Sequence, residues 1–187
     1  FLEALRDQGY LDVALEYLDR AATSSVVSDR FKTSIPFEKA EILIASSATS
    51  RDVEEMEATL TQAESLLAQY AKSIDDPASA AKILRYQGRL QQKQAQVFLA
   101  QAQSDRLTDV EKNELRAKSK QKLARSLANY REARANYRDL IQNFQIDPED
   151  PNSQNDLKRL QGVYIVIRGA LPEISESLAA AEPESSP

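Results

Sequence analysis

The chain has 187 residues and a formal net charge of −5, and hydrophobic residues make up 42% and charged residues 28% of it. This balance is typical of a folded globular protein, and the acidic charge argues against nucleic acid as the main ligand. Because the sequence contains no Cys and no His, it excludes a disulfide framework, thiolate or imidazole zinc ligation, and a Cys–His or Ser–His nucleophile within the chain. No apolar run approaches the roughly 20 residues that span a bilayer, so no membrane insertion is expected.

The composition and the spacing of apolar residues predict an all-α protein. Only 4 residues are Gly, and the helix-forming residues Ala, Leu, Gln, Glu, Arg and Lys dominate the sequence. Apolar residues recur at intervals of three and four, which places them along one side of a helix that must be buried. One clear run consists of Val53, Met56, Leu60, Ala63, Leu67, Tyr70 and Ile74.

In chain order, the pattern predicts helices over 1–7, 10–22, 36–48, 51–75, 77–104, 108–145 and 153–170, with a further one at 172–180. Pro36 suits the first turn of a helix that begins near residue 36, because a proline there sacrifices no helical hydrogen bond. Pro172 is expected to end or kink the last long helix. Asn152 or Ser153 is expected to cap the start of that helix.

Two further helix starts carry specific capping signals. Asp76 followed by Pro77 is typical of an N-cap and the first helical position. Thr108 and Glu111 have the spacing of a capping box, in which each side chain bonds to the backbone of the other residue. Gly88 and Gly162 fall within predicted helices, where we expect them to permit close contact with a neighbouring helix.

Short connections between successive helices predict antiparallel hairpins. Helices of roughly 25 to 38 residues are too long for a globin-like fold and favour an elongated stack of hairpins. We therefore expect residues 1–181 to form one helical domain and residues 182–187 to form a disordered, solvated tail. We also expect the chain to be a segment of a longer protein.

Residues 8–21, QGYLDVALEYLDRA, resemble the centre of a tetratricopeptide repeat. Such repeats have a Gly at the end of the first helix, an early Ala in the second helix, and then a large and a small residue. Here these positions are Gly9, Ala14, Leu18 and Ala21. The proline that usually follows the second helix of the family is missing from this sequence.

Beyond residue 30 the sequence departs from the repeat pattern. Residues 63–90 keep the outline of a second helix, a turn and a next first helix, but the family's usual period of about 34 residues is not kept. Residues 109–151 resemble the elongated N-terminal part of large bacterial tetratricopeptide-repeat proteins, which are generally exported. The resemblance implies an α-solenoid that presents a concave surface to a peptide or protein, and it implies no chemistry. It favours an exported, periplasmic location and leaves a cytoplasmic one open.

Aromatic and basic residues alternate in the stretch ANYREARANYRDLI, residues 128–141. Tyr130 and Tyr137 are seven residues apart, so they lie on the same side of the predicted helix, where aromatic rings most often belong to the core. Arg131 and Arg138 share a neighbouring stripe, and Arg134 lies close to the tyrosine side. These five residues are our candidates for a partner-binding surface.

The charge of this helix contrasts with that of an earlier one. Residues 116–138 contain eight basic residues and one acidic residue, a net +7, whereas residues 49–76 contain seven acidic and two basic residues, a net −5. A charge-matched or solvated helix face is the main interpretation. An acidic protein or peptide that contacts the basic helix is the second, and nucleic acid is the third.

Other clusters point to no chemistry. The loop IDPEDPNSQND at 146–156 is rich in oxygen-bearing side chains, namely Asp147, Glu149, Asp150, Asn152, Asn155 and Asp156. It lacks the Gly and the final Glu of a calcium-binding EF-hand loop, so we expect a proline-rich turn. We identify no catalytic carboxylate pair, phosphate-binding loop, metal site or cofactor site, and we do not expect an enzyme.

The segment YIVIRGAL, residues 164–171, is an unusually apolar helical stretch. Its hydrophobic side chains need cover, either from earlier helices or from another part of the protein. They are Ile165, Val166, Ile167 and Leu171, together with Val163 just before the segment.

These observations favour a non-catalytic protein–protein interaction scaffold built from tetratricopeptide-like hairpins. The partner would be another protein or peptide, with an acidic one favoured by the basic helix. One alternative is a structural or oligomerising helical-bundle or coiled-coil protein of the cell envelope, in which copies of the chain self-associate. A nucleic-acid-binding helical repeat is a further alternative, and nucleic acid is not the expected partner.

Overall fold

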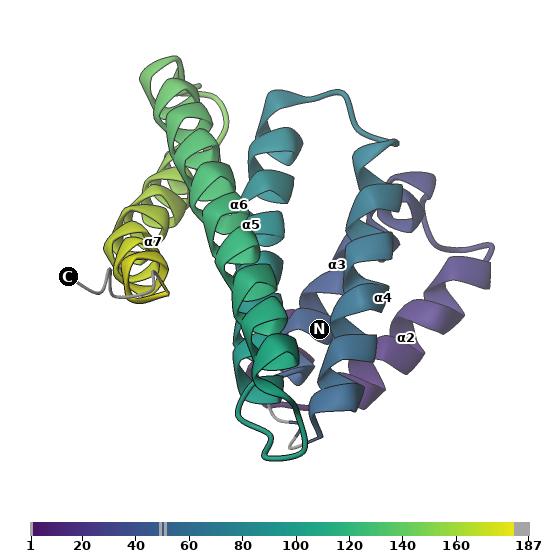
Figure 1. Ribbon diagram of the computed structural model, residues 1–187. Helices are drawn as coiled ribbons and strands as arrows, with labels where there is room; N and C mark the ends of the chain where they lie inside the picture. Colours follow the sequence, from purple (N-terminus) through teal and green to yellow (C-terminus); the bar gives the residue numbers. More distant parts are fainter. Residues whose placement is uncertain (1, 49, 51, 182–187) are drawn as a thin grey trace. The chain divides into compact units, whose positions relative to one another are not determined.

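The protein is an all-α fold, as the sequence predicts. The computed structural model describes residues 2–48, 50 and 52–181, and within these residues it contains seven α-helices and no strand (Figure 1). The helices pack as two compact units that divide between Ile74 and Asp75. This division describes which helices pack together and does not test whether residues 1–181 fold as one domain. The single domain expected over residues 1–181 therefore stays a prediction. The expected tail, residues 182–187, lies outside the described residues.

The N-terminal unit contains α1 (Leu2–Asp7), α2 (Leu11–Thr23), α3 (Asp29–Ser46) and α4 (Val53–Ala71). The buried side of α2 meets α3 in a cluster formed by Ala14, Leu18, Ala21, Ile35 and Ile42. Partly buried residues of α1, among them Leu2 and Leu5, complete this cluster.

Aromatic and charged contacts also join the helices of this unit. The rings of Phe37 in α3 and Tyr70 in α4 lie 5.3 Å apart between centroids. Arg6 in α1 forms ion pairs with Glu38, at 3.0 Å, and with Glu41, both in α3. Apolar packing and ion pairs therefore act together at the first three helices.

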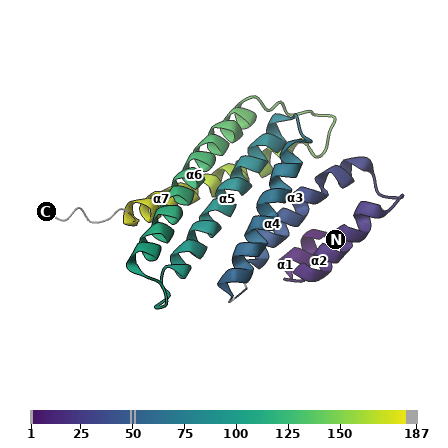
Figure 2. The same cartoon turned by 45° about the vertical axis from the view of Figure 1, so that its right-hand side comes forward.

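The C-terminal unit contains α5 (Pro77–Gln101), α6 (Asp109–Gln142) and α7 (Ser153–Ala180). Helices α5 and α6 form an antiparallel hairpin, and α7 lies against α6 at an inclination (Figures 1 and 2). The Asp76 side chain caps α5 by accepting a hydrogen bond from the Ser79 backbone N–H at 2.8 Å. Thr108 and Glu111 form the capping box predicted for α6. The structure thus confirms both predicted helix starts.

Two of the helix boundaries predicted from proline were wrong. Helix α3 begins at Asp29 rather than near residue 36, so Pro36 lies inside the helix and not in its first turn. The Ser28 side chain caps α3 by accepting a hydrogen bond from Phe31 N–H, and this signal precedes the proline. Helix α7 continues through Pro172 to Ala180, so Pro172 does not end it and residues 172–180 form no separate helix.

Burial on both sides of the prolines accounts for these longer helices. The residues next to Pro36, Ile35 and Phe37, are buried, and so are Leu171 and Ile174 around Pro172. A proline inside a helix costs about 3 kcal/mol or more, and burial of one large apolar side chain returns about 1.5–3 kcal/mol. Several such side chains therefore outweigh one lost helical hydrogen bond.

Candidate interaction surface

Helix α6 is positioned by a close contact with α5. A Cβ atom placed on Gly88 of α5 would lie only 2.6 Å from Cδ2 and 2.8 Å from Cε2 of Tyr130 in α6. The buried Ser126 hydroxyl donates a hydrogen bond to the Gly88 carbonyl at 2.8 Å. One turn further along α6, Asn129 Nδ2 donates to Gln91 Oε1 at 3.0 Å. Because only a glycine leaves room for the Tyr130 ring, the expected role of Gly88 in close helix contact is confirmed.

The same expectation is wrong for Gly162. A Cβ atom on Gly162 of α7 would meet nothing within 4 Å. Sequence alone did not distinguish the two glycines, because both fall within helical patterns and only the neighbouring helix decides which one is crowded.

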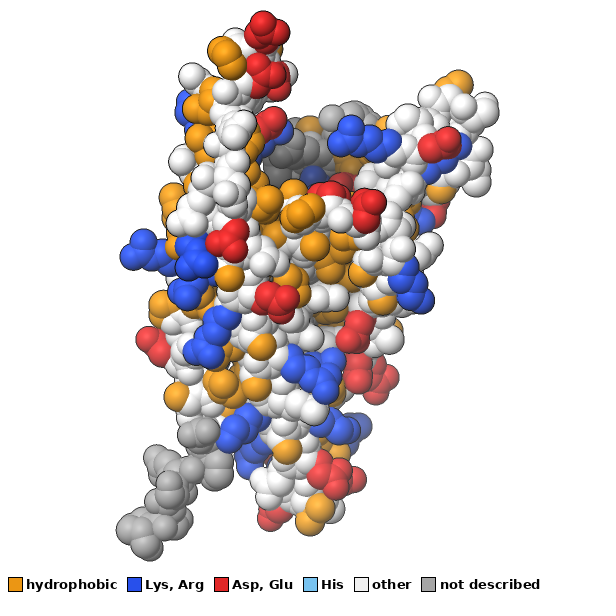
Figure 3. All heavy atoms as spheres, turned by 90° about the horizontal axis from the view of Figure 1, so that it is seen from above, with side chains coloured by type: hydrophobic (Ala, Val, Ile, Leu, Met, Phe, Trp, Pro, Cys, Tyr) orange, Lys and Arg blue, Asp and Glu red, His pale blue; other side chains and the backbone are white. Residues whose placement is uncertain are grey.

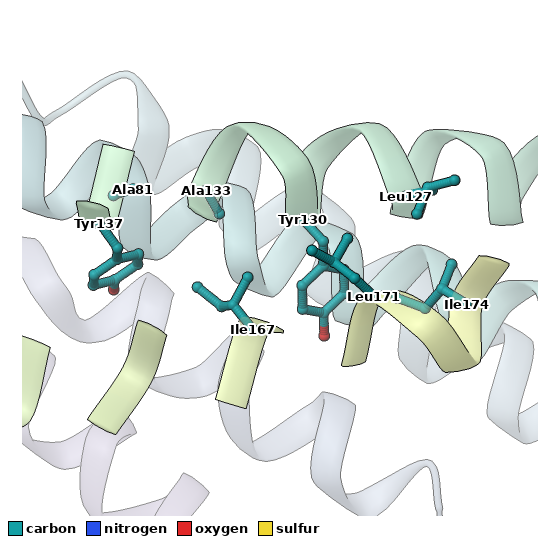
Figure 4. Close-up of a cluster of buried hydrophobic side chains, with 8 residues drawn as sticks. All are labelled: Ala81, Leu127, Tyr130, Ala133, Tyr137, Ile167, Leu171 and Ile174. Atoms are coloured by element: carbon teal, nitrogen blue, oxygen red, sulfur yellow. The ribbon is translucent and has the colours of Figure 1, made fainter. Parts of the chain in front are cut away.

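The tyrosines of the candidate surface belong to the core between α6 and α7. Tyr130 and Tyr137 point from α6 towards α7, and Ile167 of α7 lies between their rings (Figure 4). Burial raises the pKa of both tyrosines above the ordinary value of 10.0, because it disfavours the charged tyrosinate. The positive charge of Arg85 in α5 opposes this shift at both hydroxyls.

The arginines of the candidate surface lie on an exposed stripe of α6 next to the buried tyrosines. Arg131, Arg134 and Arg138 are all exposed, so the structure does not bring the five candidate residues together on one surface. Arg138 forms an ion pair with the adjacent Asp139 at 3.2 Å. Within the described part of the chain, Arg131 and Arg134 form no ion pair. The arginines are available to a ligand, and their role in partner binding stays a prediction.

A groove between α6 and α7 lies next to these arginines. It has a volume of about 540 Å³, and its lining residues are Arg138, Ile141 and Gln142 from α6 and Gln161, Tyr164 and Ile165 from α7. Hydrophobic side chains reach the surface between charged ones on the face drawn in Figure 3. The apolar segment 164–171 was recognised in the sequence, but its position opposite Arg138 depends on how α7 packs.

Segment 164–171 is covered only in part. Ile167 and Leu171 are buried against α6, whereas Ile165 and Val166 are 67% and 58% exposed. The side of α7 that carries Ile165 therefore offers apolar surface to water.

In the acidic loop after α6, two carboxylates accept hydrogen bonds from the backbone of the loop itself. Asp147 accepts a hydrogen bond from Glu149 N–H, and Asp150 accepts one from Asn152 N–H, each at 2.9 Å. The Asn152 side chain makes no capping hydrogen bond to α7, and the buried Ser153 hydroxyl instead accepts a bond from Asp147 N–H. Among the described residues, no group of three or more Asp or Glu side chains is arranged to hold a metal ion.

The tetratricopeptide-like positions lie in the turn between α1 and α2 and on the buried side of α2. Gly9 has a φ of +78°, which is the left-handed conformation that favours glycine. Ala14, Leu18 and Ala21 are buried on one side of α2. The same features occur in other helical hairpins, so the assignment of these positions to a tetratricopeptide-like repeat stays a prediction.

The fold and this surface define the protein as an all-α protein of packed helices. Within the described residues, no helix is both long enough and apolar enough to cross a membrane. Comparison of the chain with protein-family models, curated proteins and solved structures found no match.

Proposed function

We propose that the chain is a non-catalytic protein–protein interaction scaffold, built from tetratricopeptide-like hairpins stacked as an α-solenoid. The turn at Gly9 and the small buried residues Ala14 and Ala21 support the tetratricopeptide-like part of this proposal. A solenoid of this kind serves as a rigid support for an extended binding surface.

The exposed arginine row of α6 is the observation that carries the proposal. Arg131, Arg134 and Arg138 follow one another at intervals of three and four, so they lie along one side of the helix. The neighbouring side of α6, which carries Tyr130, packs against Gly88 of α5 and the Ile167 cluster of α7. Fixed positive charges on a rigid helix favour an acidic protein or peptide as the partner.

Affinity capture from the native extract tests this function. The bait is the full chain, either unchanged or with Arg131, Arg134 and Arg138 all replaced by Glu. We expect the reversal to abolish capture of a partner that the unchanged chain retains, because each contact becomes repulsive.

A matched control separates the arginine row from net charge. Replacing the exposed residues Arg30, Lys72 and Arg106 by Glu changes the net charge by the same amount at other positions. This control should retain the partner. If both triple variants lose the partner equally, a specific role for the arginine row is contradicted.

Self-association is a second candidate, and the exposed Ile165 and Val166 favour it. Copies of the chain would cover these apolar side chains by forming a helical contact between α7 helices. Sedimentation velocity over a range of protein concentrations tests this alternative. A persistent monomer would leave the scaffold with a foreign partner as the remaining candidate.

A further inference from the structure

We propose that the groove between α6 and α7 binds an acidic amphipathic helix of the partner protein. This inference rests on the scaffold function proposed above and identifies both the site and the chemistry of its ligand. Its basis is the combination of an apolar groove with basic side chains along both of its helices.

The groove offers apolar contact surface from both helices. Ile141 comes from the last turn of α6, and Tyr164 and Ile165 come from the first half of α7. Ile165 remains 67% exposed, so its side chain is still mostly hydrated. Transfer of such a side chain from water into a contact is favourable, and a partner's Leu or Ile side chains provide that contact.

Basic residues continue along α6 from the groove. Arg138 lines the groove, and Arg134 and Arg131 lie four and seven residues before it on the same side of the helix. The ion pair of Arg138 with Asp139 joins two side chains that are 58% and 57% exposed, so it stabilises the fold little. A partner carboxylate therefore competes with Asp139 at little cost.

Basic residues flank the α7 side of the groove as well. Arg168 follows Ile165 by three residues and Lys158 precedes it by seven, which places both near Ile165 on the surface of α7. Both are exposed, and neither forms an ion pair within the described ranges. None of the described residues that line the groove is acidic. A ligand with an apolar stripe flanked by carboxylates is complementary to this arrangement.

The observations favour a protein helix over other anionic ligands. A groove between two helices accommodates the apolar stripe of a third helix, with anchors at intervals of three, four and seven residues. Sites that bind single-stranded nucleic acid rely on aromatic rings that stack bases, whereas this groove contains one ring, that of Tyr164, beside two Ile side chains.

Fluorescence anisotropy with designed peptides tests the inference. The probe is a labelled peptide of about 18 residues, with Leu on one side of the helix and Glu elsewhere. A second peptide has the same composition with the Leu residues dispersed around the helix, and a third has Gln in place of Glu. We expect the full chain to bind the first peptide and to bind the second and third at least about tenfold more weakly.

Two neighbouring exposed residues provide a matched pair of variants. Ile165→Glu places a negative charge in the groove, whereas Val166→Glu places the same charge on an exposed residue that does not line it. Ile165→Glu should weaken binding of the first peptide by about tenfold or more, and Val166→Glu should change it less than about twofold. Helical circular dichroism of both variants verifies that the fold is retained.

Several results would overturn the inference. One is an Ile165→Glu protein that binds the first peptide with unchanged affinity. Another is an equal loss of affinity for this peptide in Ile165→Glu and Val166→Glu. Equal binding of the dispersed peptide would mean that charge alone attracts the ligand. Tighter binding of single-stranded RNA or of phosphatidylserine vesicles, lost in Ile165→Glu but not in Val166→Glu, would assign the groove to one of those ligands instead.

The capture experiment separates failure of this inference from failure of the scaffold function. If the triple arginine reversal abolishes capture while Ile165→Glu does not, the scaffold function holds and the groove assignment fails. If neither change affects capture, both proposals fail.

Discussion

Replacing Gly88 with Ala should destabilise the C-terminal unit, although Ala is the better helix former. The added Cβ would lie 2.6 Å and 2.8 Å from two ring carbons of Tyr130, which is well inside van der Waals contact. The ring has little freedom to move away, because Tyr130 is buried and packs in the cluster with Ile167. Relief of the contact therefore requires α5 and α6 to separate, which also lengthens the hydrogen bond from Ser126 to the Gly88 carbonyl.

The magnitude follows from two opposing terms. Overpacking a buried contact costs about 1–3 kcal/mol, and the confined Tyr130 ring places this site in the upper half of that range. The change from Gly to Ala within a helix returns up to about 1 kcal/mol. We expect Gly88→Ala to lower the free energy of unfolding by about 1–2 kcal/mol, which corresponds to a decrease in Tm of about 2–8 °C.

Urea denaturation followed by circular dichroism measures this change, and Gly162→Ala is the matched control. Gly162 also lies inside a long helix, but an added Cβ meets nothing within 4 Å. This control should stabilise the protein by about 0.5–1 kcal/mol. If the Gly88→Ala protein is as stable as the unchanged chain, the contact between position 88 and Tyr130 is not crowded as described. In a double variant, Tyr130→Leu should reduce the cost of Gly88→Ala, because the shorter side chain vacates the crowded space.

Three further predictions concern other parts of the chain. Ser126→Ala should lower the free energy of unfolding by about 1 kcal/mol because it leaves the Gly88 carbonyl without this donor. Ser119→Ala should be neutral or stabilising, since the buried Ser119 hydroxyl has no hydrogen-bond partner among the described residues. Chemical denaturation of both variants provides the comparison. Gly9→Ala should cost about 1–2 kcal/mol because of the φ of +78°, with Gly9→Asn costing less, and the Tm of the two variants measures the difference. Absorbance titration at alkaline pH should show Tyr130 and Tyr137 ionising later than exposed tyrosines. The folded state holds these protons more tightly, so their contribution to stability is present below the ordinary pKa of 10.0 and is lost as the pH rises above it. Removal of the late-ionising component by Tyr→Phe at both positions would confirm the assignment, and its persistence would contradict it.

The sequence predicted the helices because their determinants are local. The capping box at Thr108 and Glu111 and the cap at Asp76 involve residues within a few positions of one another. The intervals of apolar residues likewise depend only on the helical repeat. The helix boundaries at Pro36 and Pro172 were misjudged because the burial that offsets each proline comes from other helices.

The candidate site could be predicted only in part. The spacing of Arg131, Arg134 and Arg138 indicated one basic side of α6, and their exposure agrees with a solvated row. The tyrosines of the same stretch lie in the core, as the spacing favoured, so the stretch is divided between a buried aromatic stripe and a neighbouring exposed basic one. The groove depends on the packing of α7 against α6, and no local pattern specifies which residues of two separate helices face each other.

The contrast between the two neighbours of α6 has a consequence for sequence divergence. Helix α5 meets α6 through a main-chain carbonyl and a position with no room for a methyl group, so few substitutions fit there. Helix α7 meets α6 through large side chains and leaves its outer residues, such as Ile165, free of that packing. Related chains could therefore vary the outer residues of α7, and with them the choice of ligand, while the α5–α6 hairpin keeps its geometry.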